Sequence, residues 1–116
     1  MEFFSFLHPG GLHRPIPGIK RYSSVIVNEI FYSLQGEGRL AGVPSAFIRL
    51  AGCPLRCRWC DTKYAWDPQT GEVMTPEQMM HKIEEYPTPF VVVTGGEPMV
   101  QSNVAELIHL LAEKNR

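Results

Sequence analysis

The chain has 116 residues, of which 44% are hydrophobic and 20% are charged, a composition typical of one globular domain and not of a disordered segment. Its 11 Lys and Arg residues nearly balance its 12 Asp and Glu residues, so no overall charge would attract nucleic acid or an anionic membrane. No apolar run is long enough to span a bilayer, and the N-terminus lacks the pattern of a secretory leader. We therefore expect a cytoplasmic protein.

Residues 1–22 are rich in proline and glycine, and we expect them to form an irregular extension before a domain of residues 23–116. Strands are predicted over 25–32 and 46–51, because both segments are rich in β-branched and aromatic residues. A glycine-rich turn at 35–38 lies between them. In the second strand, alternation predicts one face with Phe47 and Arg49 and the other with Ile48 and Leu50.

A helix is predicted to begin after Thr75, with Pro76 in its first position and Gln78 completing a capping box. Its apolar stripe would consist of Met79, Ile83 and Tyr86. The apolar run 89–94 is typical of a buried parallel strand. A last helix is predicted from apolar residues at helical spacing, namely Val104, Leu107, Ile108 and Leu111. This order of elements predicts an α/β sheet that binds ligands beyond the C-terminal ends of its strands.

The three cysteines of the chain, Cys53, Cys57 and Cys60, share one segment with the spacing C-x3-C-x2-C. Three neighbouring cysteines do not indicate a disulfide framework, and thiolates kept for a metal indicate a reducing compartment. A structural zinc or an ordinary electron-transfer cluster takes four protein ligands. Three thiolates around a 4Fe–4S cluster would leave one iron open to a small molecule. The alternative is a zinc site completed by one of the four histidines, His8, His13, His81 or His109, none of which is close to the loop in sequence.

The chain resembles the radical S-adenosylmethionine (SAM) enzymes in three features. These are the cysteine motif, Trp59 just before its last cysteine, and the turn Gly95-Gly96-Glu97-Pro98 after a strand. The resemblance implies that the thiolates hold a 4Fe–4S cluster, whose open iron binds SAM and whose electron cleaves it to a 5′-deoxyadenosyl radical. It also implies that Gly95, Gly96 and Glu97 contact the methionine part of SAM, while Trp59 shields the cluster beside the adenine.

The flanking segments narrow the resemblance. Three segments are similar to those of the 7-carboxy-7-deazaguanine synthase family. They are residues 29–38 (EIFYSLQGEG), residues 47–52 (FIRLAG) and the run Cys60-Asp61-Thr62. The resemblance implies conversion of 6-carboxy-5,6,7,8-tetrahydropterin to 7-carboxy-7-deazaguanine with loss of ammonia, a lyase reaction on the path to queuosine. It also implies an electron donor such as flavodoxin and a homodimer in the full-length form.

The family resemblance implies roles for residues that bind the substrate. Glu37 and the backbone of Leu34 and Gln35 would contact the pterin ring, since a carboxylate accepts hydrogen bonds from an aminopyrimidinone edge. Arg49 would face the substrate carboxylate, and Thr62 would bind Mg²⁺ beside that carboxylate.

The residues themselves leave other interpretations open. Glu37 could be a solvent-exposed acid in a turn, and Arg49 could form an internal ion pair with Glu29 or Glu37. Asp61 and Thr62 could form a plain turn.

The resemblance also implies a partial (β/α) barrel of about six βα units, which at roughly 30 residues per unit needs ~180 residues. We therefore expect this chain to be a truncated form, the N-terminal half of the barrel, with uncertain activity of its own. Two other functions are considered. A radical SAM activase is disfavoured by the turn 35–38 and by Asp61-Thr62, and a non-catalytic zinc or iron–sulfur module would need four ligands and would not respond to SAM.

Overall fold

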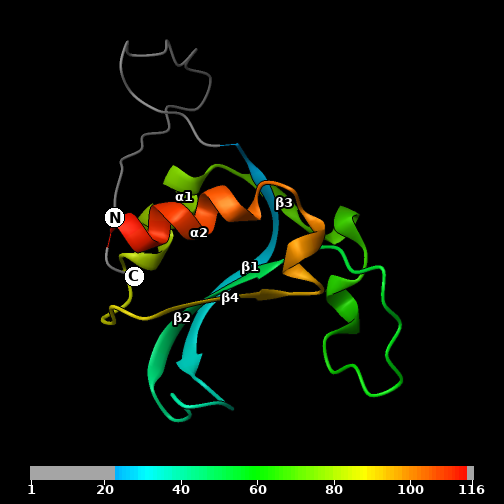
Figure 1. Cartoon of the computed structure of the whole chain (residues 1–116), viewed down its shortest axis with the longest axis horizontal. Helices are drawn as coiled ribbons and strands as arrows, with labels where there is room; N and C mark the ends of the chain where they lie inside the picture. Colours follow the sequence, from blue (N-terminus) through cyan, green and yellow to red (C-terminus); the bar gives the residue numbers. More distant parts are fainter. Residues whose placement is uncertain (1–22, 115–116) are drawn as a thin grey trace.

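The computed structural model describes residues 23–114; the extension expected over 1–22 lies outside them. Four strands form one sheet in the order β3-β1-β2-β4, and two helices lie on one side of it (Figure 1). The strands are β1 (Val25–Leu34), β2 (Pro44–Leu50), β3 (Glu72–Met74) and β4 (Val91–Gly95). The helices are α1 (Pro76–Ile83) and α2 (Val104–Glu113), with short 3₁₀ turns η1 (Lys63–Ala65), η2 (Pro68–Thr70) and η3 (Pro98–Val100).

The sheet mixes antiparallel and parallel pairing. Strand β1 is antiparallel to both β2 and β3, whereas β2 and β4 are parallel. The two parallel strands are in register at their C-terminal ends, where Leu50 pairs with Gly95. A register shift between Val27 and Glu29 bends β1. The mixed α/β architecture expected from the sequence is therefore confirmed, and β3, which the sequence analysis did not identify, adds an edge strand.

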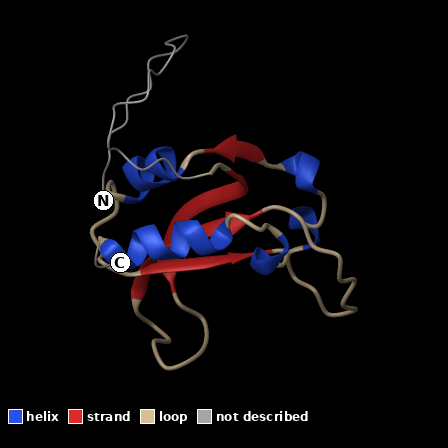
Figure 2. Ribbon diagram, turned by 45° about the horizontal axis from the view of Figure 1, so that its top comes forward, coloured by secondary structure: helices blue, strands red, loops and turns tan. Residues whose placement is uncertain are grey.

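The hydrophobic core lies between the sheet and the two helices (Figure 2). Ile48 and Leu50 of β2 are fully buried against Met79 and Leu107 of the helices, as the alternation in β2 predicts. The β4 residues 91–94 are only half-buried, because the helices cover just one face of that strand. The strand expected at 89–94 is parallel, as predicted, but it is only partly buried.

Helix α1 begins as the sequence predicts. The Thr75 hydroxyl accepts a hydrogen bond from the Gln78 backbone N–H at 3.2 Å, and the Gln78 side chain accepts one from the Thr75 N–H at 2.7 Å. This reciprocal capping box satisfies two backbone donors at the helix start. Tyr86 lies beyond the end of the helix and stacks on Tyr32 of β1 at 5.5 Å between ring centroids, so it packs against the sheet from outside the helix.

Helix α2 is rotated slightly from the predicted orientation. Val104, Leu107 and Leu111 are buried as expected, but Ile108 is 47% exposed and Leu110 is buried in its place. Both residues are apolar, so the sequence alone did not decide which of them meets the sheet. No helix within residues 23–114 has the length and apolarity needed to cross a membrane.

Gln101 ties α2 and the sheet together just before the helix begins. Its side-chain oxygen accepts a hydrogen bond from the Ile26 N–H at 2.7 Å. Its amide nitrogen donates to the carbonyls of Ile26 at 2.8 Å and Ala51 at 3.0 Å. One side chain thus satisfies backbone groups of β1 and of the segment that leaves β2.

Candidate functional site

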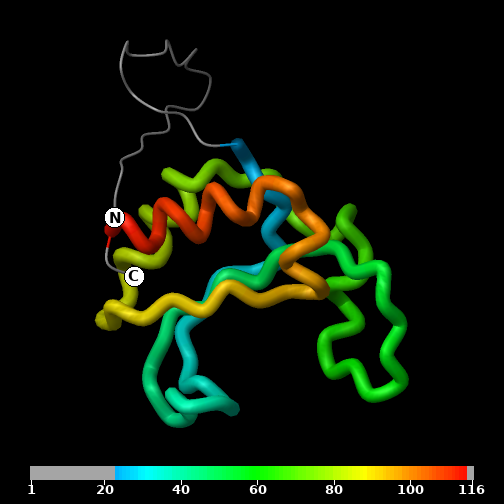
Figure 3. Tube along the Cα trace, viewed as in Figure 1, coloured from blue at the N-terminus to red at the C-terminus, as the bar shows by residue number. Residues whose placement is uncertain are grey.

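The site begins where the parallel strands β2 and β4 end. The loop with the three cysteines follows β2, and the turn Gly95-Gly96-Glu97-Pro98 follows β4. Two backbone hydrogen bonds join these segments, from the Gly96 N–H to the Leu50 carbonyl at 3.3 Å and from the Glu97 N–H to the Gly52 carbonyl at 3.0 Å. The expectation that both motifs meet at one edge of the sheet is confirmed (Figure 3).

The two glycines of the turn allow this close approach. A Cβ atom on Gly95 would lie 2.7 Å from the Leu50 carbonyl oxygen. A Cβ atom on Gly96 would collide with the Gly52 carbonyl oxygen and lie 2.8 Å from the Cys53 Cβ. Because such contacts are shorter than real Cβ atoms tolerate, only glycine lets the turn pack directly against the start of the cysteine loop.

The cysteine loop is fixed at its base. Gly52 has a φ of +101°, a conformation that favours glycine, and its N–H donates to the Ala65 carbonyl at 2.7 Å. The Cys53 N–H donates to the Trp66 carbonyl at 3.1 Å. Arg56 reaches back with one guanidinium nitrogen to the Cys53 carbonyl at 2.5 Å. The loop therefore leaves and rejoins the body of the protein through adjacent backbone segments.

All three cysteines are free thiols. Cys57 is exposed, while Cys53 and Cys60 are half-buried. The Cys60 sulfur lies 3.7 Å from the Thr62 hydroxyl oxygen. Hydrogen bonds from the backbone and the hydroxyl of Thr62 lower the pKa of the Cys60 thiol, which favours the thiolate that binds metal.

Within residues 23–114, no three His, Cys, Asp or Glu side chains already converge as a metal site. His81 and His109 are exposed on the helices, and His109 pairs with Glu113 at 3.1 Å. Neither histidine completes a zinc site with the cysteines, while His8 and His13 lie outside the described residues. Three thiols on one exposed loop match the donor chemistry of an iron–sulfur cluster with an open iron.

Trp59 and Glu97 occupy different environments beside this loop. Trp59 is 84% exposed, so most of its side chain faces solvent. Glu97 caps η3, where its carboxylate accepts a hydrogen bond from the Met99 N–H at 3.1 Å. One of its two carboxylate oxygens is therefore already used by the protein.

The sheet face opposite the helices is open and carries a pocket of about 460 Å³. It is formed where the β1–β2 turn, the strands β2 and β4 and the cysteine loop come together. Its lining residues are Gln35, Gly36, Glu37, Phe47, Asp61, Val92 and Thr94. Two residues predicted to bind substrate, Gln35 and Glu37, thus lie in one pocket beside the cysteine loop.

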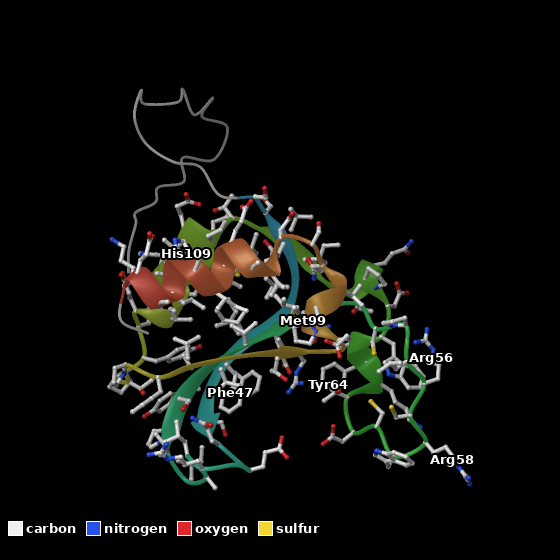
Figure 4. All side chains as sticks on the ribbon, viewed as in Figure 1. Phe47, Arg56, Arg58, Tyr64, Met99 and His109 are labelled. Carbon is white, nitrogen blue, oxygen red and sulfur yellow. The ribbon has the colours of Figure 1, made fainter. Side chains whose placement is uncertain are left out.

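Arg49 lies on the same open face, paired in register with Glu29 of β1 and Thr94 of β4. Its Nε donates to the Glu29 carboxylate at 2.8 Å, and its side chain is only 14% exposed. The guanidinium also lies 5.5 Å from the Phe31 ring centroid and 5.7 Å from that of Tyr64. The internal ion pair with Glu29 that the sequence left open is therefore present (Figure 4).

This pairing leaves part of the arginine available. Among residues 23–114, the two terminal nitrogens of Arg49 have no hydrogen-bond partner. Since a guanidinium offers five N–H donors in a fixed plane, the Glu29 contact fixes the orientation of that plane. Arg49 does not itself line the pocket, but its remaining donors are available to a carboxylate on the open face.

The ionisation of this group follows from its contacts. Burial raises the pKa of Glu29, but the hydrogen bonds from Arg49 and Tyr64 and the Arg49 charge outweigh it, so the pKa lies below its ordinary value. Tyr64 donates its hydroxyl hydrogen to Glu29 at 2.8 Å. Burial and this hydrogen bond raise the pKa of Tyr64. Glu29 therefore stays ionised, and Tyr64 stays neutral, at neutral pH.

The other predicted substrate residues are placed differently. The Gln35 N–H donates to the Val43 carbonyl at 3.0 Å, and the Gln35 carbonyl accepts from the Gly42 N–H at 2.8 Å, so both groups also hold the β1–β2 turn. Contact of the backbone around Leu34 and Gln35 with the pterin ring stays a prediction. Its side chain donates to Ser45 at 2.9 Å. Leu34 is 60% exposed at the end of β1.

The sequence did not identify four residues that line the pocket: Phe47, Asp61, Val92 and Thr94. Phe47 and Val92 are register partners on neighbouring parallel strands, and Phe47 also stacks on Phe31 at 4.9 Å. A period of two in β4 would have placed Val92 and Thr94 on one face. Nothing local marks Asp61, because the return of the cysteine loop brings it to the pocket.

Comparisons with known proteins agree with this arrangement. The model of the Radical SAM superfamily matches residues 47–116. The chain is 48% identical over 89 residues to 7-carboxy-7-deazaguanine synthase of Chlorobaculum tepidum, covering 77% of this chain and 40% of that protein. It is 53% identical over 77 residues to the enzyme of the same name from Pyrobaculum aerophilum, covering 66% of this chain and 35% of that protein.

A solved structure is also similar. The chain matches the crystal structure of QueE from Escherichia coli with a TM-score of 0.71 and 34% sequence identity, covering 79% of this chain and 49% of that one. The chain thus spans less than half the length of these relatives.

Proposed function

The chain belongs to the radical SAM superfamily, and we propose that it contributes the cluster loop and one wall of the substrate site of a 7-carboxy-7-deazaguanine synthase. The reaction is the conversion of 6-carboxy-5,6,7,8-tetrahydropterin to 7-carboxy-7-deazaguanine with loss of ammonia. The observation that carries the proposal is the pocket with Gln35 and Glu37, next to the loop with the three cysteines. Because the matched segment covers less than half of each of these relatives, we propose the complete reaction for a protein that also contains the rest of the family's fold.

Cys53, Cys57 and Cys60 would hold the cluster. When bound and reduced, a 4Fe–4S cluster supplies the electron that cleaves SAM. The protein contributes orientation and shielding. Gly95 and Gly96 keep the turn against the cluster loop, where their backbone would meet the methionine part of SAM.

The substrate is recognised through its two ends. The Glu37 carboxylate, exposed at the pocket, accepts hydrogen bonds from the aminopyrimidinone edge of the pterin. The terminal nitrogens of Arg49 bind the substrate carboxylate, with a planar geometry that suits two parallel hydrogen bonds. Thr62 would offer its hydroxyl oxygen to Mg²⁺, a hard cation that takes oxygen ligands.

The remaining parts of the site complete the enclosure. Trp59, exposed in the described chain, covers the cluster when SAM lies beside it. Glu97 directs its second carboxylate oxygen to the amino group of SAM. Asp61 adds a further carboxylate to the pocket wall.

The test uses the anaerobically reconstituted chain with SAM, Mg²⁺, a reductant and 6-carboxy-5,6,7,8-tetrahydropterin, and mass spectrometry of the products. Formation of 7-carboxy-7-deazaguanine supports the proposal, and Cys57→Ala should abolish it. Cleavage of SAM without this product, whether or not the pterin is added, would contradict the substrate assignment.

Binding supplies a second readout that does not depend on turnover. Affinity for the oxidised analogue 6-carboxypterin should fall by about tenfold or more in Glu37→Ala, which loses hydrogen bonds to a charged acceptor. The matched control is Glu72→Ala, an exposed carboxylate on β3 that lies outside the pocket. Equal affinity in both variants would remove Glu37 from the site.

A further inference from the structure

The outer surface of the cysteine loop carries a concentration of positive charge. We propose that this loop surface, residues 54–63, is the docking site for an acidic protein that donates single electrons. The inference rests on the proposed function, because such a donor is needed only if the loop holds a redox cluster. It adds a partner surface to the loop, of whose residues only Asp61 lines the substrate pocket.

The charge of the loop differs from that of the rest of the chain. Residues 54–63 contain three cations and one carboxylate, a net charge of +2. The whole chain has a net charge of −1, so the remaining residues together have a net charge of −3. The one acidic side chain of the loop, Asp61, lines the substrate pocket and is therefore turned towards that pocket.

The cations are held at the surface and are not neutralised. Arg56 donates to the carbonyls of Cys53 and Leu55, and its guanidinium lies 4.6 Å from the Trp66 ring centroid. The Lys63 ammonium lies 5.8 Å from the same ring. Within the described part of the chain, neither cation forms an ion pair with a carboxylate, so their charges remain available to a partner.

Arg58 extends the surface at the outer end of the loop. It lies among six consecutive exposed residues, 54–59, and no hydrogen bond or ion pair holds its side chain within residues 23–114. Figure 4 shows Arg58 pointing away from the body of the protein, on the same side as Arg56 and at the end far from His109. Leu55, 52% exposed, adds apolar surface to this positive area.

The position of this surface fits one-electron transfer. A flavoprotein donor in its anionic hydroquinone form loses one electron and becomes the neutral semiquinone, without moving a proton. The oxidised 4Fe–4S cluster gains that electron and becomes its one-electron reduced form. Since Arg56 and Arg58 flank Cys57 in sequence, a donor that docks on them brings its flavin close to the cluster ligands.

Electrostatics also selects the side from which the donor approaches. On the open sheet face the Glu29 carboxylate is paired with Arg49, while those of Glu37 and Asp61 at the pocket repel an acidic protein. The loop surface attracts it, and complementary charge of this kind increases the association rate and fixes orientation. Docking there leaves the pocket free for substrate. A nucleic acid is a poorer fit, because the net charge of −3 on the remaining residues opposes a long polyanion.

The test compares Arg58→Glu with two controls, Arg58→Lys and Lys82→Glu. Lys82 is an exposed cation on α1, outside the loop. Binding of an acidic flavodoxin to the cluster-loaded chain is measured by biolayer interferometry at low and physiological salt. The rate of cluster reduction by the flavodoxin hydroquinone is followed by absorbance.

At low salt we expect Arg58→Glu to weaken binding by about tenfold and to slow reduction by a similar factor, because a charge reversal replaces attraction by repulsion. Arg58→Lys and Lys82→Glu should stay within about twofold of the original chain. In the original chain, binding should weaken as salt rises, since surface charges are screened over ~8 Å at physiological ionic strength. Reduction by dithionite should be equal in all four proteins, which shows that the cluster is intact.

Equal flavodoxin affinity in Arg58→Glu and Lys82→Glu would overturn the proposal, and so would binding that ignores salt. Salt-dependent binding of a labelled oligonucleotide to the loop, with flavodoxin reduction unaffected by Arg58→Glu, would also overturn it. A chain that binds no iron would overturn the proposed function and, with it, the docking site. That outcome is recognised by iron analysis before any donor is added.

Discussion

Glu29 and Arg49 face each other across β1 and β2, where the Arg49 Nε donates to the Glu29 carboxylate at 2.8 Å. The contact uses one edge of the guanidinium and leaves its terminal nitrogens without partners in the described part of the chain. Tyr64 donates to the same carboxylate at 2.8 Å. Glu29 therefore positions Arg49, and Arg49 provides a positive charge on the open face of the sheet.

Arg49→Ala should lower the affinity for 6-carboxypterin by about 10- to 100-fold, because a charge-assisted hydrogen bond is worth about 1.5–3 kcal/mol. Affinity for a pterin without the carboxylate should not change, since Arg49 is expected to contact that group alone. Fluorescence titration with both ligands measures the difference. Arg39→Ala, an exposed arginine of the β1–β2 turn, is the control. An equal loss for both ligands would mean that Arg49 supports the sheet and not the carboxylate.

The Glu29 network predicts a pH dependence of stability. The pKa of Glu29 is lowered from its ordinary value of 4.5 in the folded protein, so the unfolded chain takes up its proton first as pH falls. The stabilisation by Glu29 should be fully present above about pH 4.5 and lost as pH falls through the lower folded-state pKa. Urea unfolding of the original chain and Glu29→Gln between pH 7 and pH 3 measures it. A stability difference that is the same at every pH would contradict this account.

The sequence predicted the parts of the fold that depend on local chemistry. The start of α1 follows from Thr75, Pro76 and Gln78, whose interactions lie within one helical turn. The two faces of β2 follow from strict alternation. The meeting of the cysteine loop and the glycine turn follows from parallel strands ending at one edge. In each case, the residues that determine the structure are close to one another in sequence, or their relative position follows from the direction of the strands.

The parts that the sequence did not predict depend on distant partners. Strand β3 has only three residues and exists because β1 pairs with it. The choice between Ile108 and Leu110 depends on how α2 packs against the sheet, since both residues are apolar. The choice of Glu29 over Glu37 as the ion-pair partner of Arg49 depends on a register shift in β1, and Asp61 reaches the pocket only through the path of the loop. Local patterns carry no information about these long-range relations.

Gly96→Ala tests the junction between the turn and the cysteine loop. The new Cβ would collide with the Gly52 carbonyl oxygen and lie 2.8 Å from the Cys53 Cβ. We expect a loss of about 1–3 kcal/mol in the free energy of unfolding, as for other overpacked sites, and weaker iron binding. Gly36→Ala is a matched control, because nothing lies within 4 Å of its added Cβ. Equal unfolding curves for the two variants would show that the junction relaxes freely.

Gln101→Ala tests the link between α2 and the sheet. The substitution removes three hydrogen bonds to the backbone of Ile26 and Ala51 and leaves part-buried backbone groups unpaired. We expect a loss of about 1–3 kcal/mol in the free energy of unfolding, measured by urea denaturation. Gln69→Ala, which alters an exposed side chain in η2, should change stability by no more than about 0.5 kcal/mol. A similarly small effect of Gln101→Ala would show that water replaces the lost contacts.

The central claim is that Cys53, Cys57 and Cys60 bind a 4Fe–4S cluster with one iron open to SAM. Electron paramagnetic resonance of the anaerobically reconstituted and reduced chain, with and without SAM, tests it most directly. The account predicts a reduced 4Fe–4S signal that changes when SAM is added and is lost in Cys57→Ala. A chain that binds zinc instead of a cluster, or a cluster signal that SAM leaves unchanged, would contradict it.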